Sequence, residues 1–137
     1  MKNLVFPVKG SKEIKRLELG EEVYINGYII GCRDASLMRI FDEKVRPAMD
    51  LWNAALLHTA PGVKKSGNKF TKICIGTTTS TRMNRFTLGL VKEYGAKAII
   101  GKGGLLDDSV EAMKKYGACY LAITGGAAAL ETTWIEA

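Results

Sequence analysis

The sequence of 137 residues is poor in histidine, cysteine and proline, with one, three and three of them respectively. Cys32, Cys74 and Cys119 lie far apart and form no C-x-x-C pair, which argues against a disulfide framework and for a reducing compartment. Cys74 and Cys119 stand within apolar segments and are expected to be small buried residues. Cys32 directly precedes Arg33 and Asp34, so it is the one thiol expected close to a site.

Common catalytic sets are missing as well. The one histidine, His58, has no nucleophile elbow to accompany it, and it is expected in the core or behind a site. The carboxylates show no pairing typical of glycoside hydrolases. Neither G-x-G-x-x-G after a strand nor G-x-x-x-x-G-K-[ST] occurs. The chain therefore lacks an evident acid–base set, which indicates that it supplies part of an active site.

Long apolar runs are absent too. No segment reaches the length of a membrane span, and the N-terminus lacks the apolar stretch of a signal peptide. A cytoplasmic protein without a membrane partner is therefore expected. With 47% hydrophobic and 25% charged residues, the chain is expected to form one domain over residues 1–137 with a core of its own.

The net charge is +6, from 20 lysines and arginines against 14 acidic residues. A basic surplus can serve nucleic acid, an acidic partner or an anionic substrate. The basic residues are dispersed and no aromatic residues are interleaved with them, so a solvated surface is preferred to a nucleic-acid patch. Nucleic-acid binding is an interpretation from charge alone, and it predicts salt-sensitive binding.

Apolar periodicity and turn residues predict the elements of the first half. A helix is expected over 11–19, a strand over 22–30, and a helix capped by Asp34 that ends at Arg46-Pro47. A short buried strand over 54–59 is expected to break at residues 60–62, and a further strand is expected over 70–75.

The second half alternates strands and helices. Helices are expected over 81–94 and 107–116, with Gly95 and Gly117 as their stops, and Val110 is expected on the buried face of the second. Strands are expected over 97–100 and 118–124, and another helix from 127. This order predicts parallel pairing and an α/β fold with a mixed sheet, in two or three layers.

The most informative stretch runs from Gly76 to Met83 and carries hydroxyls and Arg82 where a strand ends and a helix begins. Two further strand ends are similar in kind, at residues 101–104 and 124–126. Helix starts and exposed backbone N–H groups favour anions, and the carboxyl ends of parallel strands share one sheet edge. Three such ends predict one crevice for a small anionic ligand.

Five residues are expected to line this crevice: Thr78, Thr79, Arg82, Lys102 and Gly103. Arginine binds carboxylates bidentately, and lysine acts as a point charge. Hydroxyls both donate and accept, and glycine lets a ligand approach the backbone. The alternative remains open that the hydroxyls only cap a helix and the glycines only form a tight turn.

The joint pattern resembles a known family. Residues 76–83 read G-T-T-T-S-T-R-M, residues 101–104 read G-K-G-G, and residues 125–130 read G-G-A-A-A-L. These resemble the β subunit, or C-terminal domain, of the iron–sulfur class I fumarases and L-tartrate dehydratases, whose pattern is G-P-T-T-S-x-R-M, G-K-G-G and G-G-A-A-A-L. Residues 20–27 and 58–61 resemble the family's G-D-x-V-Y-x-x-G and H-A-G-P, and residues 33–35 its R-D-A, so the resemblance covers nearly the whole chain.

The resemblance implies a swivelling β/β/α domain and an α partner subunit whose three cysteines hold a 4Fe–4S cluster. This chain itself then holds no metal. Arg33, Arg82 and Lys102 would bind the carboxylates of a small dicarboxylate, with Lys102 also catalytic. Thr78 would lie at the reacting carbons, as a positioning hydroxyl or in proton transfer. The remaining substrate-binding residues are Thr79 and Gly103.

The implied function is that of a β subunit of a hydro-lyase, which adds or removes water across the double bond of a dicarboxylate. Fumarate hydration is placed before tartrate dehydration, and the active form is expected to be a homo- or hetero-oligomer. The chain departs from the pattern at Thr77, Ala60 and Leu37, which replace proline, glycine and histidine, and it is expected to be short at its C-terminus. The alternative function is a non-catalytic domain for binding an anionic metabolite or for assembly.

Overall fold

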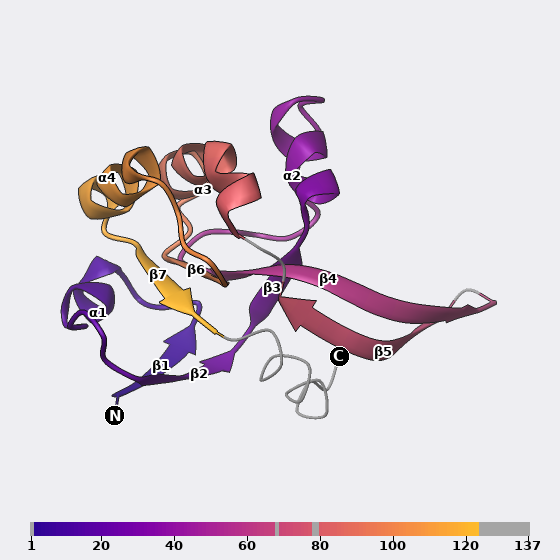
Figure 1. The fold of residues 1–137 in the computed structure, drawn as a ribbon, viewed down its shortest axis with the longest axis horizontal. Helices are drawn as coiled ribbons and strands as arrows, with labels where there is room; N and C mark the ends of the chain where they lie inside the picture. The colour runs from indigo at the N-terminus through magenta and orange to yellow at the C-terminus, as the bar shows by residue number, and fades with distance from the viewer. Residues whose placement is uncertain (1, 68, 78–79, 124–137) are drawn as a thin grey trace.

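The computed structural model describes residues 2–67, 69–77 and 80–123, with the backbone alone for 60–66 and 69–77 (Figure 1). The strands are β1 (Lys2–Phe6), β2 (Val23–Gly27), β3 (Ile29–Cys32), β4 (Ala55–Ser66), β5 (Lys69–Thr77), β6 (Ala98–Gly101) and β7 (Cys119–Ala122). The helices are α1 (Ser11–Lys15), α2 (Asp34–Phe41), the 3-10 helix η1 (Ser80–Phe86), α3 (Thr87–Lys92) and α4 (Asp107–Tyr116).

The central sheet has five strands in the described part of the chain. Four of them run parallel in the order β3-β4-β6-β7, and β5 pairs with β4 in antiparallel fashion. The second sheet is the parallel pair β1 and β2. The expected mixed α/β architecture is therefore confirmed, and β6–α4–β7 is the expected parallel unit. The strand before η1 differs, because β5 pairs with β4 and not with β6.

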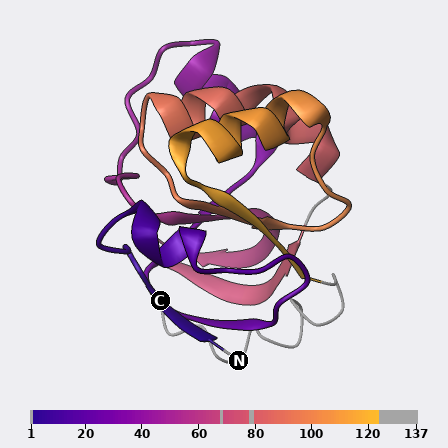
Figure 2. The same cartoon turned by 90° about the vertical axis from the view of Figure 1, so that its left-hand side faces the viewer.

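Three layers follow from the burial pattern and are visible in Figure 2. Alternate residues of a strand face opposite sides of a sheet. Leu56 and Ile99 pack into a core beneath α2, η1, α3 and α4, whereas their neighbours Ala55, Ala98 and Ile100 pack against β1 and α1. The central sheet is thus covered by helices on one face and by the β1–β2 layer on the other (Figure 2).

The helix layer is held by an aromatic cluster as well as by aliphatic side chains. Phe41 of α2 stacks on Phe86 at 5.7 Å and meets Tyr94 edge-on at 5.8 Å. Gly89 of α3 makes this approach possible, because a Cβ there would overlap the Phe41 ring. The position of α2 over the sheet therefore depends on a glycine in the neighbouring helix.

Several sequence predictions are corrected at the first half of the chain. The strand β1 was not predicted, and the strand expected over 22–30 is interrupted at Tyr28, after Gly27 with its φ of 92°. The strand expected to end before residue 60 continues as β4 to Ser66. Beyond the residues that pair in parallel with β3 and β6, β4 pairs only with β5 in the described part of the chain. The register of the β4–β5 pairing shifts between Gly62 and Val63. Proline is tolerated at such edges and bulges.

The helices are shorter or shifted relative to prediction. The segment 81–94 forms η1 and then α3, and α2 ends at Phe41, well before Arg46. Gly117 ends α4 in the left-handed conformation at φ 69°, as predicted. Gly95 has the same φ but lies three residues beyond Lys92, and α3 ends with Glu93 as its C-cap. Val110 is exposed, contrary to prediction, because the buried face of α4 carries Ser109, Ala112 and Met113.

Candidate functional site

The register of the parallel strands brings several predicted site residues to one edge of the sheet. Cys32 at the end of β3 lies opposite His58, and Leu57 lies opposite Ile100, one residue before the end of β6. The residues that follow these strands, Arg33 and Lys102, therefore emerge at the same edge on either side of β4. With neighbouring strands about 4.8 Å apart, their backbones are separated by about 10 Å.

Arg33 links the end of β3 to α2. It occupies the N-cap position with extended φ and ψ of −119° and 171°, and its side chain makes no capping bond. The prediction that Asp34 caps this helix was wrong: Asp34 is its first residue, and its Oδ1 accepts the Ala35 N–H at 2.9 Å. The exposed Arg33 guanidinium makes no hydrogen bond or ion pair with a described residue, so it is available to an anion.

Lys102 begins a loop that connects β6 to α4. The side chain is partly exposed, and Gly103 and Gly104 follow with φ values of 85° and 100°. Such values favour glycine over any residue with a Cβ. The loop can therefore turn tightly at the strand end, with Gly103 exposed directly after Lys102.

Residues of η1 form hydrogen bonds with every second residue of this loop, at positions 102, 104 and 106. The Ser80 N–H donates to the Lys102 carbonyl at 2.9 Å, and the Thr81 hydroxyl donates to the Gly104 carbonyl at 3.0 Å. Further along, the Leu106 N–H donates to the Oδ1 of Asn84 at 2.8 Å. The structure thus brings two of the predicted strand ends together, residues 80–84 with residues 101–104.

A buried chain of hydrogen bonds supports the loop from beneath. The Gly104 N–H donates to the Tyr120 hydroxyl at 3.2 Å, and that hydroxyl donates to Ser80 Oγ at 3.1 Å. Ser80 Oγ lies 2.8 Å from His58 Nδ1. The Ser80 hydroxyl accepts from Tyr120, and it can donate to Nδ1 or accept from it according to the tautomer of His58.

His58 is fully buried and neutral at ordinary pH. Burial lowers its pKa to about 4, because the charged imidazolium is disfavoured away from water. Its Nε2 has no hydrogen-bond partner among the described residues. The expectation of a histidine in the core is confirmed, whereas no local pattern indicated that Ser80 and Tyr120 would connect it to the glycine loop.

Cys32, the thiol expected close to a site, ends β3 directly before Arg33. The Cys32 side chain is buried, and burial raises the pKa of its thiol to about 12. Cys119 has a pKa raised to about 11 by burial and packs on the opposite face of the sheet. These two thiols therefore cannot converge on one metal cluster, and no group of three potential metal ligands occurs in the described part of the chain.

Arg82 is exposed in η1, two residues after the Ser80 that contacts Lys102. Two predicted site residues, Thr78 and Thr79, lie outside the described residues. The third predicted strand end, residues 124–126, lies there too. Among the predicted site residues, the described ones at this edge are the cations Arg33, Arg82 and Lys102 and the backbone of Gly103. Such a set can bind and orient an anion.

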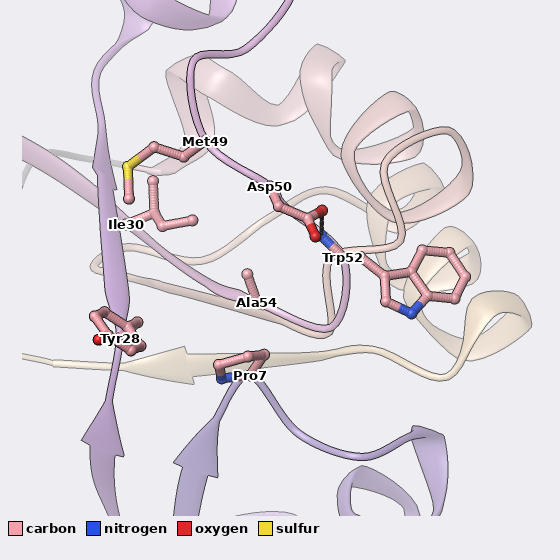
Figure 3. Close-up of a pocket in the computed structure, with 7 residues that line it drawn as sticks. All are labelled: Pro7, Tyr28, Ile30, Met49, Asp50, Trp52 and Ala54. Carbon is pink, nitrogen blue, oxygen red and sulfur yellow. Dashed lines mark hydrogen bonds between the residues drawn. The ribbon is translucent and has the colours of Figure 1, made fainter.

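A separate cavity of about 260 Å³ lies at the opposite end of the strands, where β3 and β4 begin (Figure 3). Tyr28, Ile30, Met49 and Trp52 are among its lining residues. Its one charged group is Asp50, whose Oδ1 accepts the Trp52 N–H at 3.0 Å. An apolar wall with a carboxylate disfavours an anion, so this cavity does not compete with the cationic edge as an anion site.

Comparison with known proteins agrees with the resemblance in the sequence. A protein-family model described as the fumarase C-terminus matches residues 3–137. The L(+)-tartrate dehydratase subunit beta of Escherichia coli (strain K12) is 31% identical over 135 residues, 98% of this chain and 67% of that protein. The putative L(+)-tartrate dehydratase subunit beta of Methanocaldococcus jannaschii is 35% identical over 122 residues, 87% of this chain and 63% of that protein.

A longer relative matches the same region. The putative fumarate hydratase class I of Geobacillus stearothermophilus is 33% identical over 127 residues, which are 92% of this chain and 24% of that protein. The chain thus corresponds to part of each of these relatives. None of the helices in the described part of the chain is long and apolar enough to cross a membrane.

Proposed function

The chain belongs to the fumarase C-terminus family, and from this membership and the cationic sheet edge we propose that it is the β subunit of a dicarboxylate hydro-lyase. The observation that carries the proposal is the register of the parallel sheet. It places Arg33 and Lys102 at one edge, where η1 ties the Lys102 loop to the segment that carries Arg82. Cations spaced in this way can hold the two carboxylates of one small substrate.

The proposed roles follow from the chemistry of each group. Arg33 and Arg82 bind the substrate carboxylates, and Lys102 binds a carboxylate and supplies charge at the reacting end. Gly103 has no side chain, so the substrate can approach its backbone closely. Thr78 and Thr79, outside the described residues, complete the proposal as hydroxyls beside the reacting carbons and the substrate.

The proposed partner is an α subunit that holds a 4Fe–4S cluster. The relatives' names, in which this segment is a subunit beta, support a partner. The opposed faces and raised pKa values of Cys32 and Cys119 fit a cluster held outside this chain. When bound in the partner, such a cluster supplies a Lewis-acidic iron for the substrate hydroxyl.

The substrate class is a four-carbon dicarboxylate, with fumarate and tartrate as the two candidates that the relatives' names provide. The three layers of the fold are compatible with the proposed swivelling β/β/α domain, which would move as a body toward the cluster. A single domain over 1–137 and a cytoplasmic location are part of the same proposal. The proposed cytoplasmic location is supported by Cys32 and Cys119, which form no disulfide bond in the described part of the chain.

A binding or assembly role without catalysis is the second candidate. It is favoured by the described residues proposed for the site, because Arg33, Arg82, Lys102 and Gly103 contain no evident acid–base pair and the one histidine is buried. Such an edge can bind an anionic metabolite, or a partner, without taking part in a reaction. The two candidates differ in whether turnover depends on this chain.

The test is anaerobic co-production with the α subunit encoded by the same source, followed by assays of fumarate, malate and tartrate conversion. We expect Arg82→Ala to lower kcat/KM by about 100-fold, since a bidentate contact to substrate is lost. Arg85→Ala is the matched control. It removes the same charge from the same helix, but the Arg85 guanidinium is bound to Asp42 by hydrogen bonds of 2.9 and 2.7 Å.

Two results would contradict the proposal. Equal activity of the Arg82 and Arg85 variants would remove Arg82 from the site. Full turnover by the α subunit without this chain would favour the binding or assembly role. A complex whose activity needs this chain and is lost with Arg82 alone would support the hydro-lyase proposal and identify its substrate.

A further inference from the structure

The loop that carries Lys102 has little stiffness of its own. Gly103 and Gly104 follow the lysine directly, and glycine is the residue with the widest range of backbone conformations. A cation that must meet a carboxylate needs a fixed starting point, because small displacements of a binding group reduce its effect steeply. The position of Lys102 must therefore be set by contacts from outside the loop.

The Thr81 hydroxyl holds the Gly104 carbonyl at 3.0 Å, and the other contacts involve Tyr120 and Ser80. The Tyr120 hydroxyl accepts the Gly104 N–H at 3.2 Å and donates to Ser80 Oγ at 3.1 Å, while the Ser80 N–H holds the Lys102 carbonyl at 2.9 Å. Ser80 is thus bound to both ends of the Lys102–Gly104 segment, once through its backbone and once through Tyr120. At its inner end the chain stops at His58 Nδ1, 2.8 Å from Ser80 Oγ.

We propose that Tyr120, with Ser80 and His58 behind it, is a positioning residue that holds the Lys102 loop in the geometry for dicarboxylate binding. The inference rests on the proposed function, because it takes Lys102 as a substrate-binding group. Tyr120 acts through the Gly104 amide and Ser80 and does not itself touch the substrate.

Two features indicate that the hydroxyl groups, and not only packing, maintain this arrangement. Ser80 and His58 are fully buried, where a polar group is costly unless it is hydrogen-bonded. Gly101 faces them at the end of β6, and a Cβ on this residue would overlap Ser80 Oγ and lie 3.2 Å from the Tyr120 hydroxyl. The absence of a side chain at Gly101 is therefore what admits the Ser80 hydroxyl to the chain of hydrogen bonds.

The first arm of the test measures the loop itself, independently of activity. Tyr120→Phe keeps the ring and deletes the hydroxyl, so the Gly104 N–H loses its acceptor. In the full chain, hydrogen exchange followed by NMR should show Gly104 exchanging about tenfold faster or more, with Ile99 in the core unchanged. Tyr116→Phe is the matched control, since the half-buried Tyr116 hydroxyl makes no hydrogen bond with a described residue.

The second arm measures the consequence in the assembled complex with the α subunit. Tyr120→Phe should raise KM for the dicarboxylate about tenfold while kcat changes about threefold or less, since the lysine remains present but is less well placed. Ser80→Ala should produce the same split. The double variant should cost little more than the worse single variant, because both changes break one chain.

The outcomes separate this inference from the proposed function. Fast exchange at Gly104 together with the KM effect supports it. Any of three results would overturn it. The first is unchanged exchange of the Gly104 amide in Tyr120→Phe. The second is fast exchange with KM and kcat equal to those of Tyr116→Phe, and the third is additive effects of Tyr120→Phe and Ser80→Ala. An inactive wild-type complex would contradict the proposed function and, with it, the role in substrate binding, while the exchange data would still report whether Tyr120 holds the loop.

Discussion

The Nδ1 atom of His58 and the Oγ atom of Ser80 lie 2.8 Å apart between the central sheet and the helices. This contact joins β4 to the first residue of η1, and it is the innermost link beneath the cationic edge. Since both side chains are fully buried, any change in their protonation or volume is expected to affect the stability of the fold as well as the loop above them.

The first prediction concerns pH. Burial lowers the pKa of His58 from 6.5 to about 4, so between these values the unfolded state binds more protons than the folded state. The free energy of unfolding should therefore fall as pH decreases through this range, by up to about 3 kcal/mol at 1.36 kcal/mol per pKa unit. Urea unfolding at several pH values from 7 to 4 measures this slope.

The control for the pH prediction is His58→Gln, which has no group that titrates in this range and should show a much smaller slope. Asp42 and Glu21 have pKa values lowered from 3.8 and 4.5, by hydrogen bonds from Arg85 and from the Glu18 N–H respectively. They lose their contributions mainly below the window. Equal slopes for the wild-type chain and the variant would show that His58 is not the responsible group.

The second prediction concerns the space at the end of β6. Gly101→Ala should place a Cβ on the Ser80 hydroxyl and destabilise the protein by about 1–3 kcal/mol, the usual cost of overpacking. Gly10→Ala is the comparison, since no atom lies within 4 Å of a Cβ there. Chemical denaturation of both variants gives the difference, and equal stabilities would mean that Ser80 can move aside without cost.

The third prediction concerns Gly89, where helix propensity and packing predict opposite effects of an alanine on stability. Alanine is favoured over glycine within a helix by about 1 kcal/mol, so propensity alone predicts that Gly89→Ala stabilises α3. The structure predicts the opposite sign, because the new Cβ would overlap the Phe41 ring, which is confined between Phe86 and Tyr94. A higher thermal midpoint for this variant would show that Phe41 rearranges freely.

The fourth prediction concerns Asn84, which joins η1 to the start of α4. Its Oδ1 accepts the Leu106 N–H at 2.8 Å, its Nδ2 donates to Asp108 at 2.9 Å, and its carbonyl accepts the Ser109 hydroxyl at 3.1 Å. Asn84→Ala should lower the free energy of unfolding by about 2 kcal/mol, because the part-buried Leu106 N–H loses its acceptor and Asp108 loses its donor, while the Ser109 bond to the main-chain carbonyl remains. Urea denaturation measures the loss.

The adjacent residue provides a control for Asn84. Arg85 is exposed and binds Asp42 at the surface, where ion pairs contribute little to stability. Arg85→Ala should therefore unfold close to the wild-type midpoint. If both variants lose stability equally, the hydrogen bonds of Asn84 are not what secures α4.

Prediction from the sequence was most successful where local chemistry governs structure. Gly117 ends α4 in the left-handed conformation that glycine favours, and β6, α4 and β7 lie close to their predicted places. The buried face of α4 was misplaced, because Val110 is the more apolar residue but Ser109 has a hydrogen-bond partner in Asn84. That partner lies in another helix, so no local pattern reveals it.

Prediction failed where a distant strand determines the outcome. The segment 2–6 becomes β1 because β2 lies beside it, and β4 continues past Pro61 because β5 returns along it in an antiparallel hairpin. Neither partner can be identified from the composition of the segment alone. Strand formation depends on what lies alongside far more than helix formation does.

The sequence by itself determined the family and the α/β class, because motifs and glycine positions are local properties. It placed Arg33 and Lys102 after strands, and the shared edge of parallel strands then brings them together. Only the tertiary structure identified Tyr120, Ser80 and His58 as one chain beneath the loop. Their hydrogen bonds span 22 to 40 residues of sequence and exist only when β4, β7 and η1 are packed together.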